Sequence, residues 1–331
     1  MQRIINDPVH VVEDMIEGFK KCHKDIVHIS DNNPRVVVSN WARNKKRVGI
    51  VTGGGSGHKP AFIGYCGKNM VDAVAVGEVF SSPTAKSFYD AIREADQGMG
   101  VACLYGNYAG DNMNVKMAIE LAEDDEILVR TVVANDDVAS APKDEKSKRR
   151  GVAGEILMWK VAGASANNGD SLEEVIRLSQ KAIDNTRSVG VGLSPCTIPA
   201  FGKPNFIIEE GTMEFGIGHH GEPGISVKEL STAKEMAKEM TKIIFDDFEI
   251  ESNDDIVVLV SGLGSTPVME QYIFYSEVEK IIKERNTNIY KSYVGNYFTS
   301  LEMNGITLTI MKLDDELRPL IDEEVITVGI K

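Results

Sequence analysis

The strongest constraint on the fold is a unit that recurs from Arg47 onward, in which a short apolar run is followed by a turn rich in glycine or aspartate. The four runs and their turns are RVGIVT with GGGSGH, DAVAV with GEVFSSPT, GVACLY with GNYAGDN, and EILVRTVVA with NDD. The second and third turns lead directly into the helical patterns SPTAKSFYDAIREA and NMNVKMAIELAEDD. Strands that alternate with helices at this interval predict an α/β sheet that is mainly parallel.

The remainder of the chain predicts a second unit of the same class. Residues 8–28 carry apolar groups at helical spacing, and the charged loop 141–150 precedes two helices, GVAGEILMWKVAGASA and SLEEVIRLSQKAIDNT. Further strands are predicted at VGVGL, PNFIIE, MEFGIG, DIVVLVSGLGSTP, NIYKSYVG, GITLTIMKL and VITVGI, with a long helix at STAKEMAKEMTKIIFDDF. Since 331 residues suit two domains of roughly 150 each, we expect two α/β domains, 1–187 and 188–331. Each is expected to hold a mostly parallel or mixed sheet flanked by helices.

Charge and hydropathy limit the classes of function. The net charge of −14 repels nucleic acid and anionic membranes, so neither is expected as a partner. No stretch approaches the ~20 continuous apolar residues of a membrane-spanning helix. The first residues turn acidic and amphipathic instead of forming a signal or transit peptide, which predicts a cytoplasmic protein. The cysteines lack metal-ligand spacing and are interpreted as buried thiols in a reducing compartment: Cys22, Cys66, Cys103 and Cys196.

Candidate functional side chains gather in the turns that follow the first strands. In open α/β sheets ligands bind beyond the carboxyl ends of the strands, where we expect His58, Ser81 or Ser82, and Asp111. The turn GGGSGH fits neither glycine-rich nucleotide motif, since His58 stands where the phosphate-binding lysine would be. Its donors suit the oxygens of a small ligand, although such turns often serve only helix packing. SGLGSTP, 261–267, has the look of a phosphate loop, but we favour a tight turn between a strand and a helix.

Two interpretations of Asp111 stay open. Aspartate commonly caps a helix, and here the helix would begin at Asn112 or Met113. It would equally serve as a base, but a helix N-terminus lowers the pKa of a carboxyl, so a base at this place needs partial burial.

The stretch MEFGIGHHGEPG, 213–224, sets two adjacent histidines among glycines. We interpret the glycines as leaving room for a ligand carbon to reach an imidazole nitrogen. Adjacent residues of a strand point to opposite faces, so His219 and His220 do not easily share a metal ion, which is the rival hypothesis. Glu222 is the candidate to hold one nitrogen of His220 as a donor and leave the other free as a nucleophile. Attack on a ketone by a ring nitrogen gives a hemiaminal, whereas a satisfied strand histidine is the purely structural alternative.

Taken together, these motifs resemble the dihydroxyacetone kinase family, in particular its free-standing substrate-binding K subunit. The resemblance rests on GGGSGHKPA, GEVFSSPT, NYAGDNMN, RRGVAG, GKPNF, FGIGHHGEPG, GLGSTP and VGNYFTSLEMNGITLTIMKLDDE, in unbroken order from about residue 5 to the C-terminus. It implies a homodimer of two-domain α/β chains that binds dihydroxyacetone covalently through His220. It also implies that His58 and Asp111 are acid–base groups for the substrate hydroxyls. The implied substrate contacts are Gly55, Ser56, Gly57, His58, Gly106 and Asp111.

The same resemblance places the phosphoryl donor on another polypeptide. It implies an L subunit that carries ADP or ATP with magnesium and, indirectly, a phosphotransferase-system M subunit, with no metal and no cofactor in this chain. Three positions depart from better-known K subunits, which often have Glu at Lys59, Lys at Gly106 and an aliphatic residue at His219. These changes predict a larger pocket, so a tetrulose such as erythrulose is an alternative substrate. A non-catalytic paralogue that binds dihydroxyacetone and coactivates a transcription regulator is the other alternative.

Overall fold

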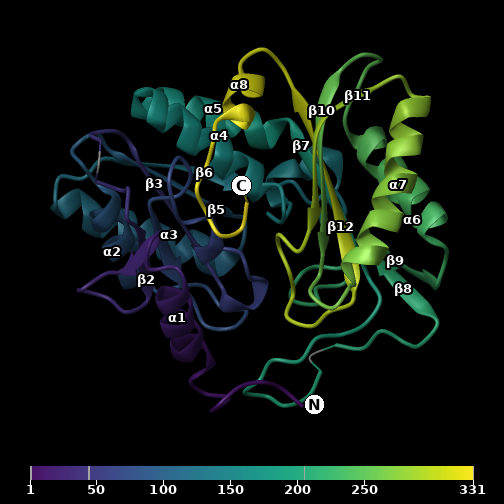
Figure 1. The fold of residues 1–331 in the computed structure, drawn as a ribbon, viewed down its shortest axis with the longest axis horizontal. Helices are drawn as coiled ribbons and strands as arrows, with labels where there is room; N and C mark the ends of the chain where they lie inside the picture. The colour runs from purple at the N-terminus through teal and green to yellow at the C-terminus, as the bar shows by residue number, and fades with distance from the viewer. Residues whose placement is uncertain (1, 44, 205, 331) are drawn as a thin grey trace.

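The computed structural model describes residues 2–43, 45–204 and 206–330. Two six-stranded sheets and three pairs of helices form alternating layers (Figure 1). The predicted α/β class with two mixed sheets flanked by helices is confirmed.

The first sheet carries the recurring strand–turn units. Its strands are β1 (Val27–Ile29), β2 (Val36–Ser39), β3 (Gly49–Gly54), β4 (Ala73–Val76), β5 (Val101–Gly106) and β6 (Val129–Ala134). Their spatial order is β1-β2-β4-β3-β5-β6. The four predicted strands, β3 to β6, pair in parallel, whereas β1 and β2 add an antiparallel edge that the sequence pattern did not predict. The turns after β3, β4 and β5 therefore meet at one edge of the sheet.

The second sheet is mixed. It consists of β7 (Thr186–Gly192), β8 (Thr212–Phe215), β9 (Ser226–Glu229), β10 (Asp255–Gly262), β11 (Asn288–Gly295) and β12 (Gly305–Leu313), in the order β11-β10-β12-β7-β8-β9. Only β10 and β11 pair in parallel. The boundary expected between residues 187 and 188 falls inside β7, and the division into two domains stays a prediction.

Three pairs of helices form layers around the two sheets, and α1 and α8 lie outside these pairs. The helices are α1 (Val11–Cys22), α2 (Ala85–Ala95), α3 (Ala109–Asp124), α4 (Glu155–Asn168), α5 (Leu172–Asp184), α6 (Ala233–Asp247), α7 (Val268–Glu284) and α8 (Leu317–Asp322), with 3-10 turns at Ser56–His58, Ile63–Tyr65 and Lys143–Lys148. Figure 1 shows α4 and α5 between the sheets, α2 and α3 outside the first sheet, and α6 and α7 outside the second.

Alternation of side chains along the strands fixes these layers. Val74 and Val76 of β4 join the central core around α4, whereas the intervening Ala75 packs toward α2 and α3. In β10, Val257 and Leu259 face the central core while their neighbours face α6 and α7. Helix α4 is buried from Glu155 to Ala166, as expected of a helix that is apolar on all sides.

Several sequence predictions are wrong in detail. PNFIIE forms no strand in its described residues, and residue 205 lies outside them. VITVGI makes only an isolated bridge, from Ile326 to Lys68, and MEFGIG is a strand only as far as Phe215. Cys22 is exposed because it ends a surface helix, whereas the other three cysteines are buried thiols as predicted.

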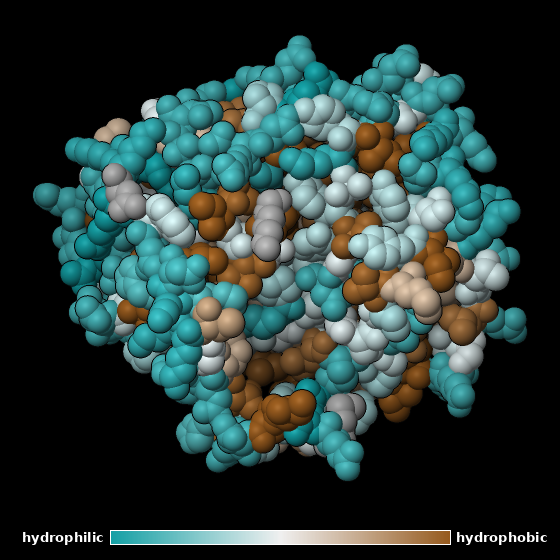
Figure 2. All heavy atoms as spheres, viewed as in Figure 1, coloured by the Kyte–Doolittle hydropathy of each residue, from teal (hydrophilic) through white to brown (hydrophobic). Residues whose placement is uncertain are grey.

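The surface in Figure 2 is mainly hydrophilic toward its outer edge, and hydrophobic residues are visible mostly in its middle. Within the described residues, no helix combines the length and the apolar character needed to cross a membrane.

Candidate active site

A cavity of about 300 Å³ lies where the turns of the first sheet meet loops of the second. It is lined by Gly53, Gly54, Gly55, His58, Phe62, Phe80, Ser81, Ser82, Gly106, Tyr108, Ala109, Gly110, Asp111, Glu155, His220 and Phe298. The turns after β3, β4 and β5 thus supply most of its wall, as expected for the carboxyl edge of a parallel sheet. His220 and Phe298 come from the other half of the chain.

The centre of the cavity is a contact between two histidines. Nε2 of His58 lies 3.0 Å from Nε2 of His220. The other nitrogen of each ring is already committed, because Nδ1 of His58 donates to the Thr299 carbonyl at 2.7 Å and Nδ1 of His220 donates to the Glu222 carboxylate at 2.8 Å. Two neutral rings held in these tautomers would face each other with two lone pairs. One proton placed between the two Nε2 atoms would join the rings in a hydrogen bond, and His58 could then pass that proton to a ligand.

Burial and charge around the two rings favour a neutral His58 and an ionised Glu222. Burial lowers the pKa of His58 well below its usual value, and the neighbouring His220 and His219 lower it further. Burial alone would raise the pKa of Glu222, but the hydrogen bond and charge of His220 outweigh it and lower that pKa far below the usual value. Glu222 is therefore a carboxylate that stabilises positive charge on the His220 ring.

The two histidines lie in a turn after β8 instead of in a continuing strand. Gly221 N donates to Gly218 O at 3.0 Å, which closes a turn with His219 and His220 at its centre. His219 is buried beside the cavity, stacks on Phe298 at 5.0 Å between ring centres, and lies 3.4 Å from the Thr307 hydroxyl. The sequence analysis separated His219 and His220 because it placed them on opposite faces of a strand. That reason is wrong, because the two residues lie in a turn. No group of three His, Cys, Asp or Glu side chains suited to a metal ion occurs in the described part of the chain.

The glycines of this segment serve the turn and not the ligand, which corrects the sequence interpretation. Gly216 and Gly221 have φ of 73° and 86°, a region that other residues rarely adopt. A Cβ at Gly218 would overlap the Glu222 carboxyl and Arg150 guanidinium groups. Gly218 therefore makes room for the carboxylate that holds His220.

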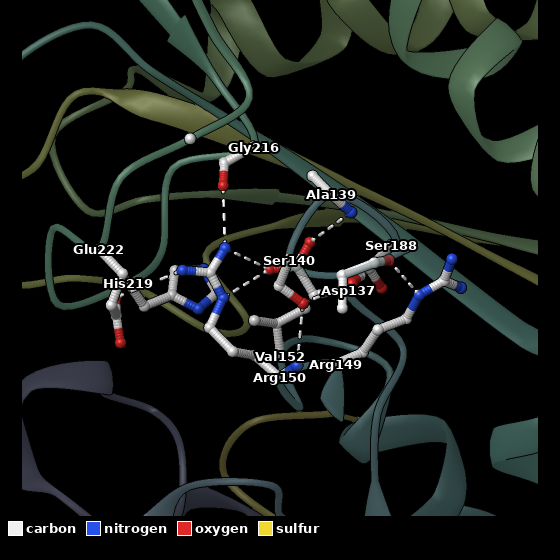
Figure 3. Close-up of polar contacts among 12 residues, drawn as sticks. Asp137, Ala139, Ser140, Arg149, Arg150, Val152, Ser188, Gly216, His219 and Glu222 are labelled. Carbon is white, nitrogen blue, oxygen red and sulfur yellow. Dashed lines mark hydrogen bonds and ion pairs between the residues drawn. The ribbon is translucent and has the colours of Figure 1, made fainter. Parts of the chain in front are cut away.

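Arg150 holds the Glu222 carboxylate in position (Figure 3). Its guanidinium pairs with Asp137 at 2.8 Å, donates to the Gly216 carbonyl at 2.9 Å, and lies 3.8 Å from Glu222. Because Arg150 and Asp137 are both largely buried, this ion pair is rigidly enclosed. The chain of contacts from Asp137 through Arg150 to Glu222 sets the orientation of the His220 ring.

Asp111 lies on the cavity wall, in the first turn of α3. The helix begins earlier than predicted, with Tyr108 as the N-cap, so Asp111 is not the capping residue. The Ser82 hydroxyl donates to its carboxylate at 3.0 Å. Burial raises the pKa of Asp111 to about 6, although the hydrogen bond from Ser82 and the charge of His220 lower it in part. This compensation by burial is what a base at a helix N-terminus requires.

The GGGSGH turn is held tightly by its own contacts. Gly55 lines the cavity, whereas the Ser56 hydroxyl donates to the Gly77 carbonyl at 2.7 Å. The Gly57 carbonyl accepts from Leu301 N at 2.8 Å, and a Cβ at Gly57 would overlap the Phe80 ring. These contacts connect the turn to the loop 298–301 of the second half. They place His58 at the seam between the two sheets.

Sequence reasoning missed three residues of the site. Thr299 and Phe298 lie within the quoted motif VGNYFTSLEMNGITLTIMKLDDE, but neither was singled out, because they reach the site only through the fold. Glu155 lines the cavity at the start of α4. A signal for Glu155 was present, because it is a lone carboxylate at the beginning of the apolar run EILMWKVAGASA.

Fold and site together define a class: α/β proteins of two sheets that close a small polar cavity around paired histidines and a buried aspartate. Residues 17–329 match the Dak1 domain family. The chain belongs to this family.

Three relatives illustrate its range. The dihydroxyacetone-binding subunit DhaK of PTS-dependent dihydroxyacetone kinase 1 from Listeria innocua is 45% identical over 319 residues, 96% of this chain and 95% of that protein. The D-erythrulose kinase of Mycolicibacterium smegmatis is 37% identical over 317 residues, which cover 96% of this chain but 54% of that protein. The solved structure of the dihydroxyacetone kinase operon co-activator Dha-DhaQ has a TM-score of 0.89 and 31% identity, with 96% and 97% of the two chains covered.

Proposed function

We propose that this chain is the ketose-binding subunit of a multi-subunit dihydroxyacetone kinase. The observation that carries the proposal is the 3.0 Å contact between His58 and His220, with Nδ1 of His220 held by Glu222. A ring nitrogen oriented in this way is a competent nucleophile toward a ketone. The likeness to the dihydroxyacetone-binding subunit from Listeria innocua over nearly the whole length of both chains supports the same assignment.

In the proposed capture step, Nε2 of His220 forms a bond to the ketone carbon while the carbon–oxygen π pair moves to the oxygen. A proton shared by the histidine pair passes through His58 to that oxygen and completes a hydroxyl. Positive charge remains on the His220 ring, opposite the Glu222 carboxylate. The product is a hemiaminal, which retains all atoms of the sugar because a ring nitrogen has no second hydrogen to lose as water. Glycerol has no carbonyl and is excluded from this reaction.

Phosphoryl transfer then needs a base and a donor. Asp111 accepts the proton of the ketose hydroxyl as that oxygen attacks phosphorus. The donor is ATP, held with magnesium on a separate L subunit, and ADP leaves as the bond to phosphorus forms. The ADP is then recharged through a phosphotransferase-system M subunit or exchanged for ATP. We further propose that the chain acts in the cytoplasm as a homodimer. Covalent tethering supports catalysis because it removes the translational and rotational freedom of the ketose before transfer.

Two alternatives each have a specific observation in their favour. The likeness to a structure named as an operon co-activator favours a regulatory paralogue that binds ketose without phosphorylating it. The likeness to a D-erythrulose kinase favours a four-carbon substrate.

The deciding experiment is native intact-mass analysis of the chain with dihydroxyacetone, followed by an assay with an L subunit and a donor. We expect an adduct of the whole sugar mass, no adduct with His220→Ala, and product phosphate only when the L subunit is present. An adduct lighter by one water indicates an imine and contradicts the hemiaminal. Sugar binding without phosphate from any L subunit supports the co-activator, and stoichiometric zinc with chelator sensitivity would revive the metal hypothesis.

A further inference from the structure

Glu155 is an unusual side chain in the wall of the cavity. It is 1% exposed, and within the described residues neither of its carboxyl oxygens has a hydrogen-bond partner. Its own backbone N–H bonds to the Val152 carbonyl, and the nearby Asp136 is satisfied by Val152 N, Gly154 N and the Ser188 hydroxyl. A buried carboxyl without a partner destabilises the fold, so retaining one in the wall of this cavity points to a ligand that satisfies it.

The backbone at Gly106 leaves room for the Glu155 carboxyl. A Cβ at Gly106 would lie 2.5 Å from Oε1 of Glu155, so the present position of the carboxyl depends on a glycine at the end of β5. Gly106 and Glu155 both line the cavity that holds His58, Asp111 and His220. The two residues together form one recess of that cavity.

The charge around Glu155 indicates what it binds. Burial raises the pKa of Glu155 well above its usual value, and the nearby Asp136 and Asp111 raise it further. This environment favours the protonated carboxyl, which both donates and accepts a hydrogen bond. Such a group suits a sugar hydroxyl better than an ammonium ion, which would require the carboxylate.

The cavity of about 300 Å³, which is partly open to solvent, has room beside the six non-hydrogen atoms of dihydroxyacetone. In the proposed function His220 takes the carbonyl, Asp111 takes the hydroxyl that receives phosphate, and Gly55 and His58 of the GGGSGH turn are left for the second hydroxyl of dihydroxyacetone. We propose that Glu155 and Gly106 form a specificity subsite for the additional hydroxyl of a four-carbon ketose. This inference rests on the proposed function, because it concerns the same substrate cavity.

The test compares the dissociation constants of dihydroxyacetone and erythrulose, measured by calorimetry on the full chain. The variants are Glu155→Met, which keeps the volume but removes the hydrogen bond, and Glu155→Gln, which restores a donor and an acceptor. Glu120→Met on the exposed face of α3 is the matched control. We expect the wild-type chain to bind erythrulose at least as tightly as dihydroxyacetone. Glu155→Met should weaken erythrulose about tenfold more than dihydroxyacetone, whereas Glu155→Gln and the control keep the wild-type ratio.

The outcomes separate this inference from the proposed function. Equal weakening of both sugars by Glu155→Met, or a wild-type preference for dihydroxyacetone, overturns the subsite while the proposed function stands. Failure of the wild-type chain to bind either ketose contradicts the proposed function itself. Thermal unfolding of the sugar-free chains gives a second readout. Glu155→Met should raise the midpoint because it removes an unsatisfied buried carboxyl, and a lowered midpoint would indicate a structural role instead.

Discussion

At the scale of single residues, Asp111 combines two opposing influences. Its place in the first turn of α3 favours the carboxylate, but burial in the cavity wall wins and raises the pKa to about 6. A base with this pKa is ionised at neutral pH and still strong enough to accept a proton from a hydroxyl.

The pH dependence of phosphoryl transfer should report this group. Since the carboxylate is the active form, kcat measured with a partner L subunit should rise with pH through about 6 and fall as Asp111 becomes protonated below it. Asp111→Asn should slow the transfer by roughly 10²–10⁴-fold and abolish this limb of the profile. An unchanged limb in the variant would assign it to another group.

Whether the role of a residue could be predicted depends on how far along the sequence its contact partner lies. Glu222 was predicted as the partner of His220 because it is only two residues away, and the contact is present at 2.8 Å. Thr299 holds His58 from 241 positions along the chain, and no local pattern contains that information. Glu155 begins a helix, where a glutamate is usually a solvent-exposed favourable charge, so only the apolar run that follows it indicated its burial.

At the scale of elements, the turn Gly218–Gly221 follows β8 and positions the His220 ring against Glu222. Gly218→Ala should force the Glu222 carboxyl or the Arg150 guanidinium to move, because both overlap the added methyl group. We expect the affinity for dihydroxyacetone to fall about ten- to a hundredfold, measured by calorimetry.

Gly211→Ala is the control for this prediction. Gly211 precedes β8 with φ of 80°, and nothing lies within 4 Å of its added Cβ. This substitution should strain the backbone and lower stability without weakening ketose binding. If both variants bind equally well, the turn does not orient His220 through Glu222.

The elements that were predicted correctly include the strands β3 to β6, as short apolar runs before polar turns, and the helices α2 to α6, by their helical spacing. PNFIIE and VITVGI have strand-like composition, but in the described residues they make only isolated bridges, at Pro204 and Ile326. The Thr327 hydroxyl donates to the Ile330 carbonyl and accepts from Ile330 N, which folds the second segment into a turn. Strand formation depends on a partner, and the partner is not encoded locally.

At the scale of the whole molecule, the site is assembled across the seam between the sheets. His58 follows β3 of the first sheet, whereas His220 and Thr299 belong to loops of the second. A ligand bound at this seam should stabilise both halves together.

Ketose should therefore raise the thermal stability of the intact chain. At a concentration a hundred times the dissociation constant, linkage predicts about 2.7 kcal/mol of additional stability, visible as a higher unfolding midpoint in calorimetry. His220→Ala should lose most of this increase, and glycerol should produce none in the wild-type chain. Equal stabilisation by glycerol would show that the effect does not depend on the carbonyl.

The helix α4 lies between the two sheets, and its first residue, Glu155, borders the substrate cavity. Most substitutions in α4 would disturb the packing of both sheets at once, so the body of the helix has little freedom to vary. Its first residue differs, because that side chain also lines the cavity, in the space that a Cβ at Gly106 would occupy. A substitution at this end of the helix would therefore alter the cavity while leaving most of the packed helix unchanged, and it would have to stay compatible with the residue at the end of β5.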